Sequence, residues 1–181
     1  MGKMSTRWFR SGPLDVEILR SGVLLSAHRT RHEPEGADEV RGIDLLNLPT
    51  VNNTGWGIET TDTVGEDFDP SEIGYMGIDG KYYLSDADSA AQMPAKVMAM
   101  ESISADAAGR LLHIGYYRHD AWTWAWVAGE GNLLFADTTP GAMVQFAAKP
   151  AAVGDQVQVV GYVVTEDIAF FNPSYELVEI A

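Results

Sequence analysis

The chain contains no cysteine among its 181 residues, so disulfides, thiolate catalysis and cysteine-based zinc sites are all excluded. It also lacks a run of 18 apolar residues, and we therefore expect no membrane-spanning helix. No basic segment followed by an apolar core opens the sequence, so we expect no secretory signal peptide. Phosphate-binding glycine loops and the Gly-x-Ser-x-Gly elbow of serine hydrolases are missing as well.

Basic residues are scarce, because 12 lysines and arginines stand against 26 acidic residues, which gives a formal net charge of −14. Residues 1–41 hold seven basic and six acidic residues, whereas residues 42–181 hold five basic and twenty acidic ones. So acidic a surface repels phosphate backbones, and we expect no direct binding to nucleic acid. The uneven distribution has two interpretations: it serves solubility, or the N-terminal part is docked on a partner while the body faces solvent.

We assign residues 1–73 to an N-terminal arm and extension, because this part of the sequence has few regular patterns. Residues 1–13 show no periodicity, yet Trp8 and Phe9 lie within this polar stretch. Such aromatics either anchor a partner or pack back onto the same chain. Asp15 to Ala27 alternates like two short strands, and the acidic segment 59–72 is expected to be an exposed loop.

From residue 74 to residue 181, short apolar segments alternate with turn signals such as Asp79-Gly80 and Asn172-Pro173. Closely spaced short strands are typical of a small antiparallel β-barrel or sandwich, so the sequence predicts a mainly β domain with few short helical turns. One helical turn is expected over Ser89–Met93. The predicted strands are Lys81–Leu84, Lys96–Ser102, Arg110–Arg118, Ala121–Val127, Leu133–Ala136, Met143–Ala147, Gln156–Thr165, Ile168–Phe171 and Tyr175–Ile180.

Three tryptophans, Trp122, Trp124 and Trp126, recur at every second residue of Ala121–Val127. In a strand this spacing places all three on one face and the small residues on the other. We expect the tryptophan face to pack against the core or a neighbouring subunit, with Trp124 the most buried. If exposed instead, the indoles would stack on sugars or on a partner protein.

The sequence offers few candidate catalytic or metal-binding residues. His28 and His32 have the i, i+4 spacing of a zinc-binding helix, but arginines and a proline interrupt the segment. The acidic stretch Glu66–Glu72 lacks the spacing and the glycine of a calcium loop. His119-Asp120 is either an oriented imidazole or a plain loop pair at the end of a strand. None of these patterns predicts a specific metal or catalytic site.

Five stretches of the sequence carry a resemblance: Asp79–Ala90, Ala105–Trp124, Gly131–Gly141, Gly154–Val164 and Phe171–Ile180. The last two stretches carry the resemblance most strongly. They form a valine-rich strand followed by Phe171-Asn-Pro-Ser near the chain end. Together they make residues 74–181 similar to a C-terminal β module of tailed-bacteriophage virion proteins, among them capsid decoration (cement) proteins. Residues 1–73 resemble no known family.

The resemblance implies a structural virion protein that binds the outside of a phage capsid, as a homotrimer at threefold sites, and stabilises the shell. Its partners would be the major capsid protein and other copies of itself, and it would assemble in the cytoplasm of the bacterial host. Residues 1–73 would then contain the segment that docks on the capsid.

Decoration proteins of this kind carry no catalytic residues, so no enzymatic activity is expected, and we expect no cofactor and no metal site in this chain. Capsid or subunit contacts are assigned to Trp8, Phe9, Trp122, Trp124 and Trp126. The alternative is a head-fibre or tail-associated module that binds a receptor or glycan.

Overall fold

The computed structural model of the chain describes residues 47–181, which belong to one compact unit. The predictions made for Trp8 and Phe9, for two strands within Asp15–Ala27 and for His28 and His32 lie outside the described residues. None of the helices in the described part of the chain is long and apolar enough to cross a membrane.

The described residues are mainly β, and the predicted antiparallel β class is confirmed. Helical structure is limited in this part of the chain to three short 3₁₀ turns, η1 (Ala90–Gln92), η2 (Gly129–Asn132) and η3 (Phe146–Ala148). The strands are β1 (Thr54–Thr63), β2 (Ile73–Met76), β3 (Tyr82–Leu84), β4 (Val97–Ala99), β5 (Ala108–Arg118), β6 (Leu133–Ala136), β7 (Met143–Gln145), β8 (Gln156–Val157), β9 (Val159–Thr165), β10 (Ile168–Phe171) and β11 (Val178–Glu179).

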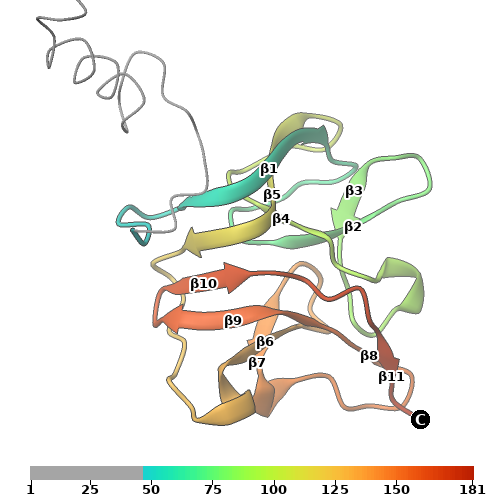
Figure 1. Cartoon of the computed structure of the whole chain (residues 1–181). Coiled ribbons are helices and arrows are strands. Elements are labelled where there is room, and N and C mark those ends of the chain that lie inside the picture. Colours follow the sequence, from blue (N-terminus) through green and yellow to red (C-terminus); the bar gives the residue numbers. More distant parts are fainter. Residues whose placement is uncertain (1–46) are drawn as a thin grey trace, which may run out of the picture. The chain divides into compact units, whose positions relative to one another are not determined.

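Nine of these strands form one antiparallel sheet that curls into a half-barrel (Figure 1). Its order is β3-β2-β4-β5-β10-β9-β6-β7, with β1 paired to β5 outside this path. The remaining strands, β8 and β11, pair with each other near the end of the chain. Every strand pairing of the sheet is antiparallel, which agrees with the short turns that separate the strands in the sequence.

The long strand β5 organises the sheet. One of its edges pairs with β1 from end to end, while the other pairs first with β4 and then with β10. Gly57 faces Gly115 across the β1–β5 pair, and a Cβ atom at Gly57 would lie 1.9 Å from the Ile114 carbonyl oxygen. These glycines therefore permit an approach of the two backbones that a larger residue would block. His113 is the extra residue of a bulge, because the register shifts between Ile58 and Glu59.

Two apolar clusters lie on opposite faces of β5. Leu111 belongs to one and its neighbour Leu112 to the other, as expected for successive residues of a strand. The larger cluster fills the inside of the half-barrel with residues from β2, β4, β5, β6, β9 and β10, including Tyr117, Leu134 and Phe171. The smaller one is closed by residues that precede β2 and follow β4.

The prediction of an exposed loop over residues 59–72 is wrong. Residues 59–63 are the second half of β1, and Val64 and Phe68 are buried in the smaller cluster. The Phe68 N–H donates to the Ile103 carbonyl at 2.8 Å, which fixes this segment against the chain that follows β4. Because the sheet begins at Thr54, the β-rich unit extends N-terminally of residue 74.

Several predicted strands are confirmed. Arg110–Arg118 lies within β5, and Leu133–Ala136 and Ile168–Phe171 coincide with β6 and β10. The predicted helical turn over Ser89–Met93 contains η1. The predicted strand Gln156–Thr165 is divided at Gln158 into β8 and β9, since the side chain of that residue is buried and bonded to backbone groups of other segments.

Candidate functional site

The tryptophan segment, Ala121–Val127, is not a strand, so this part of the sequence prediction is wrong. It lies outside the sheet and connects β5 to η2. The predicted alternation nevertheless holds for its first half: Trp122 and Trp124 are half-buried against the larger apolar cluster, and Thr123 between them is exposed. Trp126 departs from the pattern, because 71% of its surface is exposed.

Side-chain amides take the place of a neighbouring strand. The Ala125 N–H donates to Gln145 Oε1 at 2.9 Å, and Gln145 Nε2 donates to the Ala125 carbonyl at 2.8 Å. Gln145 Nε2 also donates to the Gly131 carbonyl, and Asn132 Oδ1 accepts from the Val127 N–H at 2.9 Å. The Gln145 amide thus makes the pair of hydrogen bonds that the backbone of a neighbouring strand would make. These bonds hold the tryptophan segment beside β7 although the two backbones do not pair.

The indoles form a stack that begins inside the half-barrel. The Trp122 ring lies 6.0 Å from the Tyr117 ring and 5.5 Å from the His119 ring, in edge-to-face arrangements. Trp124 follows with its ring centroid 5.4 Å from that of Trp122. Contacts of this kind add to the stabilisation by burial. Trp126, two residues beyond Trp124, is mostly exposed to solvent.

A shallow groove of about 450 Å³ runs between the tryptophan segment and the edge of the sheet. One wall is formed by residues 121–124 and the other by β7 and η3, with Met143 and Gln145 among the lining residues. Within the described part of the chain, the Trp124 Nε1–H is buried and has no hydrogen-bond acceptor. A mostly apolar groove with an exposed indole two residues beyond it can hold another protein segment or a sugar ring.

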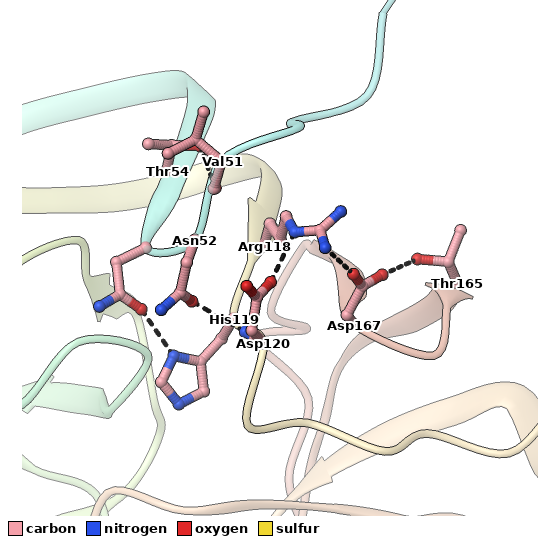
Figure 2. Close-up of polar contacts among 9 residues, drawn as sticks. Val51, Asn52, Thr54, Arg118, His119, Asp120, Thr165 and Asp167 are labelled. Carbon is pink, nitrogen blue, oxygen red and sulfur yellow. Dashed lines mark hydrogen bonds and ion pairs between the residues drawn. The ribbon is translucent and has the colours of Figure 1, made fainter.

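A polar network fixes the base of the tryptophan segment (Figure 2). Arg118, the last residue of β5, forms ion pairs with Asp120 at 2.6 Å and with Asp167 at 2.5 Å. The Thr165 hydroxyl donates to Asp167 at 2.6 Å, so the β9–β10 turn is tied to the same arginine. Figure 2 shows the guanidinium between the two carboxylates, while Asn52 Oδ1 accepts from the Asp120 N–H at 2.8 Å.

His119 is a structural member of this network. Its Nδ1 lies 2.7 Å from Asn53 Oδ1, an acceptor, so the neutral ring carries its proton on Nδ1. The adjacent Asp120 is engaged by Arg118 instead, and burial lowers the His119 pKa against the opposing charge of Asp120. Of the two interpretations of His119-Asp120, the geometry supports the loop pair at the end of the strand, because the carboxylate does not orient the imidazole.

Carboxylates of the acidic stretch at residues 66–72 accept hydrogen bonds from backbone N–H groups. Glu66 Oε1 accepts from the Leu84 N–H at 2.6 Å, and Asp67 Oδ1 accepts from the Ala105 N–H at 2.7 Å. Glu72 Oε2 accepts from the Asp69 N–H at 2.7 Å. These carboxylates satisfy donors that surround the buried Phe68. Among residues 47–181, no three histidine or acidic side chains are arranged to hold a metal ion.

Two half-buried histidines, His119 of this network and His113 in the bulge of β5, give the stability of the fold a pH dependence. Burial lowers the pKa of His119 and of His113 below the ordinary value of 6.5, so the folded chain binds fewer protons than the unfolded chain as the pH falls below 6.5. Their contribution is therefore present above that pH and is lost on acidification towards the folded pKa values. We expect the free energy of unfolding, measured in denaturant, to decrease between about pH 7.5 and 5.5, and His119→Gln to reduce this decrease. An identical slope in the variant would contradict the assignment.

The sequence identified Trp122, Trp124 and Trp126 but not the residues that position them. Gln145 and Asn132 lie in other segments, and their polar side chains give no sign of the contacts that they make. Arg118 lies two residues before Asp120 in the sequence, but its second partner, Asp167, is distant in the chain and is brought close only by the pairing of β5 with β10.

No protein-family model, no curated protein and no solved structure matches this chain.

Proposed function

We propose that the chain is a structural virion protein that binds the outside of a phage capsid, as a homotrimer at threefold sites, and stabilises the shell. The resemblance of residues 74–181 to virion proteins motivates the proposal, and the mainly β fold agrees with what that resemblance implies. Its partners are the major capsid protein and further copies of the chain, assembled in the bacterial cytoplasm. The mechanism is added interface, since a bridge between capsid subunits must be broken before either can leave.

The observation that carries the proposal is the tryptophan groove, the shallow groove between residues 121–124 and β7. An indole that is 71% exposed lies two residues beyond it, and the segment bearing that indole is anchored at Gln145 and Arg118. A rigidly held aromatic surface suits a protein contact, because little conformational entropy is lost when it binds. The acidic remainder of the body would keep decorated particles from adhering to one another.

A second function is favoured by the same exposed indole. Trp126 can stack on a sugar ring, and this would make the chain a head-fibre or tail-associated module that binds host glycan. The two functions differ in what the tryptophan groove contacts: a capsid subunit in the first, a carbohydrate on the host surface in the second.

The temperature at which capsids rupture distinguishes the capsid-binding function from the glycan-binding function. Capsids of the parent phage, with and without the protein, should rupture at different temperatures, with the decorated shells the more resistant. A ligand bound only to the intact lattice stabilises it by mass action, by about 2.7 kcal/mol per site at a hundredfold excess over its Kd. The control is the Trp126→Ala variant at equal concentration, which should protect less. Equal rupture midpoints at saturating occupancy would argue for adhesion instead.

A further inference from the structure

A row of large side chains crosses the outer face of the half-barrel. Tyr116 of β5 stands opposite Phe170 of β10, and Phe170 stands opposite Tyr162 of β9. The ring centroids are 4.9 Å apart for Tyr116 and Phe170 and 5.3 Å apart for Tyr162 and Phe170. Ile114, two residues before Tyr116, is paired with Ile58 of β1 and continues the row. We call these five residues the outer apolar face.

The outer apolar face lies on the side of the sheet opposite to the larger apolar cluster. The strand neighbours Tyr117, Ala169 and Val163 all point into that cluster, so the side chains beside them point outward. One end of this outward surface, at Leu111, is covered by the segment that holds Phe68. Residues 47–181 leave the outer apolar face partly exposed: Ile58, Tyr162 and Ile114 are 51%, 43% and 37% exposed, while Tyr116 and Phe170 are half-buried.

The outer apolar face carries no charged side chain, and this limits which partner can cover it. Residues 42–181 carry twenty acidic and five basic residues, but all five members of the outer apolar face are uncharged. A basic partner would be attracted to the carboxylates of this acidic body rather than to an uncharged face. A second copy of the chain is repelled by the net negative charge of the body, and it can approach closely only where that charge is absent. Aromatic, charge-depleted patches are also typical of interface cores.

We propose that the outer apolar face is the contact through which copies of this chain associate. The inference rests on the homo-oligomer part of the proposed function and supplies the surface for it. In a homotrimer, the outer apolar faces of the three copies would meet around the threefold axis, where each face is buried against the other two. Because the associating bodies carry charge of the same sign, salt should strengthen the association by screening their repulsion.

The size of the face sets the strength of the contact. Large side chains expose roughly 150–250 Å² each when free, so three that are close to half exposed and two that are half-buried offer together roughly 300–400 Å² per copy. Standard stable interfaces bury about 800 Å² per partner. The outer apolar face alone therefore supports a weak association that depends on concentration.

Sedimentation velocity of the full chain tests the proposal with a matched pair of double variants. Ile58→Thr with Tyr162→Ser alters the outer apolar face, whereas Ile78→Thr with Tyr175→Ser makes the same changes at exposed positions in loops, away from that face. Each protein is measured from low micromolar to several hundred micromolar, at low and high salt. Thermal unfolding of both variants, which change only exposed side chains, checks that they are folded.

We expect the wild type and the loop variant to associate with increasing concentration, and more strongly at high salt. The face variant should need at least about a tenfold higher concentration, which corresponds to about 1.4 kcal/mol. A wild type that stays monomeric throughout, or a face variant that associates like the wild type, would overturn the proposal. Capsid binding by a monomeric wild type would refute this surface while leaving the capsid-binding function intact.

Discussion

Trp124→Ala should lower the free energy of unfolding by about 3 kcal/mol, measured by denaturant titration of the full chain. The indole packs against the larger apolar cluster and against Trp122, so its removal opens a cavity beneath the tryptophan segment. Such a loss is a large part of the stability of an ordinary domain, and soluble yield should fall with it. Trp124→Phe should cost less, because it keeps an aromatic ring and removes the buried Nε1–H.

Trp126→Ala is the matched control, since it removes the same side chain two residues further on, where 71% of the surface is exposed. Its free energy of unfolding should change little. If Trp124→Ala is as stable as the wild type, the indole is not part of the core. A stable Trp124→Ala variant that fails to bind host cells would favour the fibre function. One that loses only capsid binding or self-association would make the indole an assembly contact.

Gln158→Leu should destabilise the fold by about 3–5 kcal/mol, since each buried group left without a partner costs about 1–3 kcal/mol. The Gln158 amide accepts from the Ala95 N–H at 2.8 Å, donates to the Ala95 carbonyl at 2.9 Å and also donates to the Ser174 carbonyl. Leucine has a similar size and cannot make any of these bonds. Thermal and denaturant unfolding would both report the loss.

The neighbouring Gln156 provides the comparison for Gln158. Gln156 is also buried, but its Nε2 contacts are longer, 3.1 Å to the Gly154 carbonyl and 3.4 Å to Glu179. Gln156→Leu should therefore cost less than half as much as Gln158→Leu. Equal losses in the two variants would show that the hydrogen bonds of Gln158 to Ala95 and Ser174 do not contribute the stability assigned to them.

The strands that the sequence predicted best are those whose apolar residues alternate or run together. β5, β6 and β10 contain such residues, and each lies between two other strands of the sheet. β1 was missed because its sequence, TGWGIETTDT, is rich in glycine, threonine and acid and resembles a loop. Its glycines are required by the close approach of β5, which is a property of the pair and cannot be recognised in one strand alone.

The tryptophan segment shows how far a periodic pattern can be interpreted. Alternation correctly placed Trp122 and Trp124 towards the core, because it reports two environments on either side of the chain. It did not report whether another strand lies alongside. The place of a neighbouring strand is taken by Gln145, whose amide bonds Ala125 from twenty residues away. A single glutamine within the apolar stretch Met143–Ala147 gives no sign of such a contact.

The most direct test of the proposed function is the position of this chain in an electron-microscopy map of the phage particle. The capsid-binding account predicts density for residues 54–181 on the outside of the shell at threefold sites. It also predicts that the tryptophan segment faces a capsid subunit and that the outer apolar faces of neighbouring copies contact one another. Density confined to a fibre or to the tail tip, with Trp126 pointing away from the particle, would contradict it.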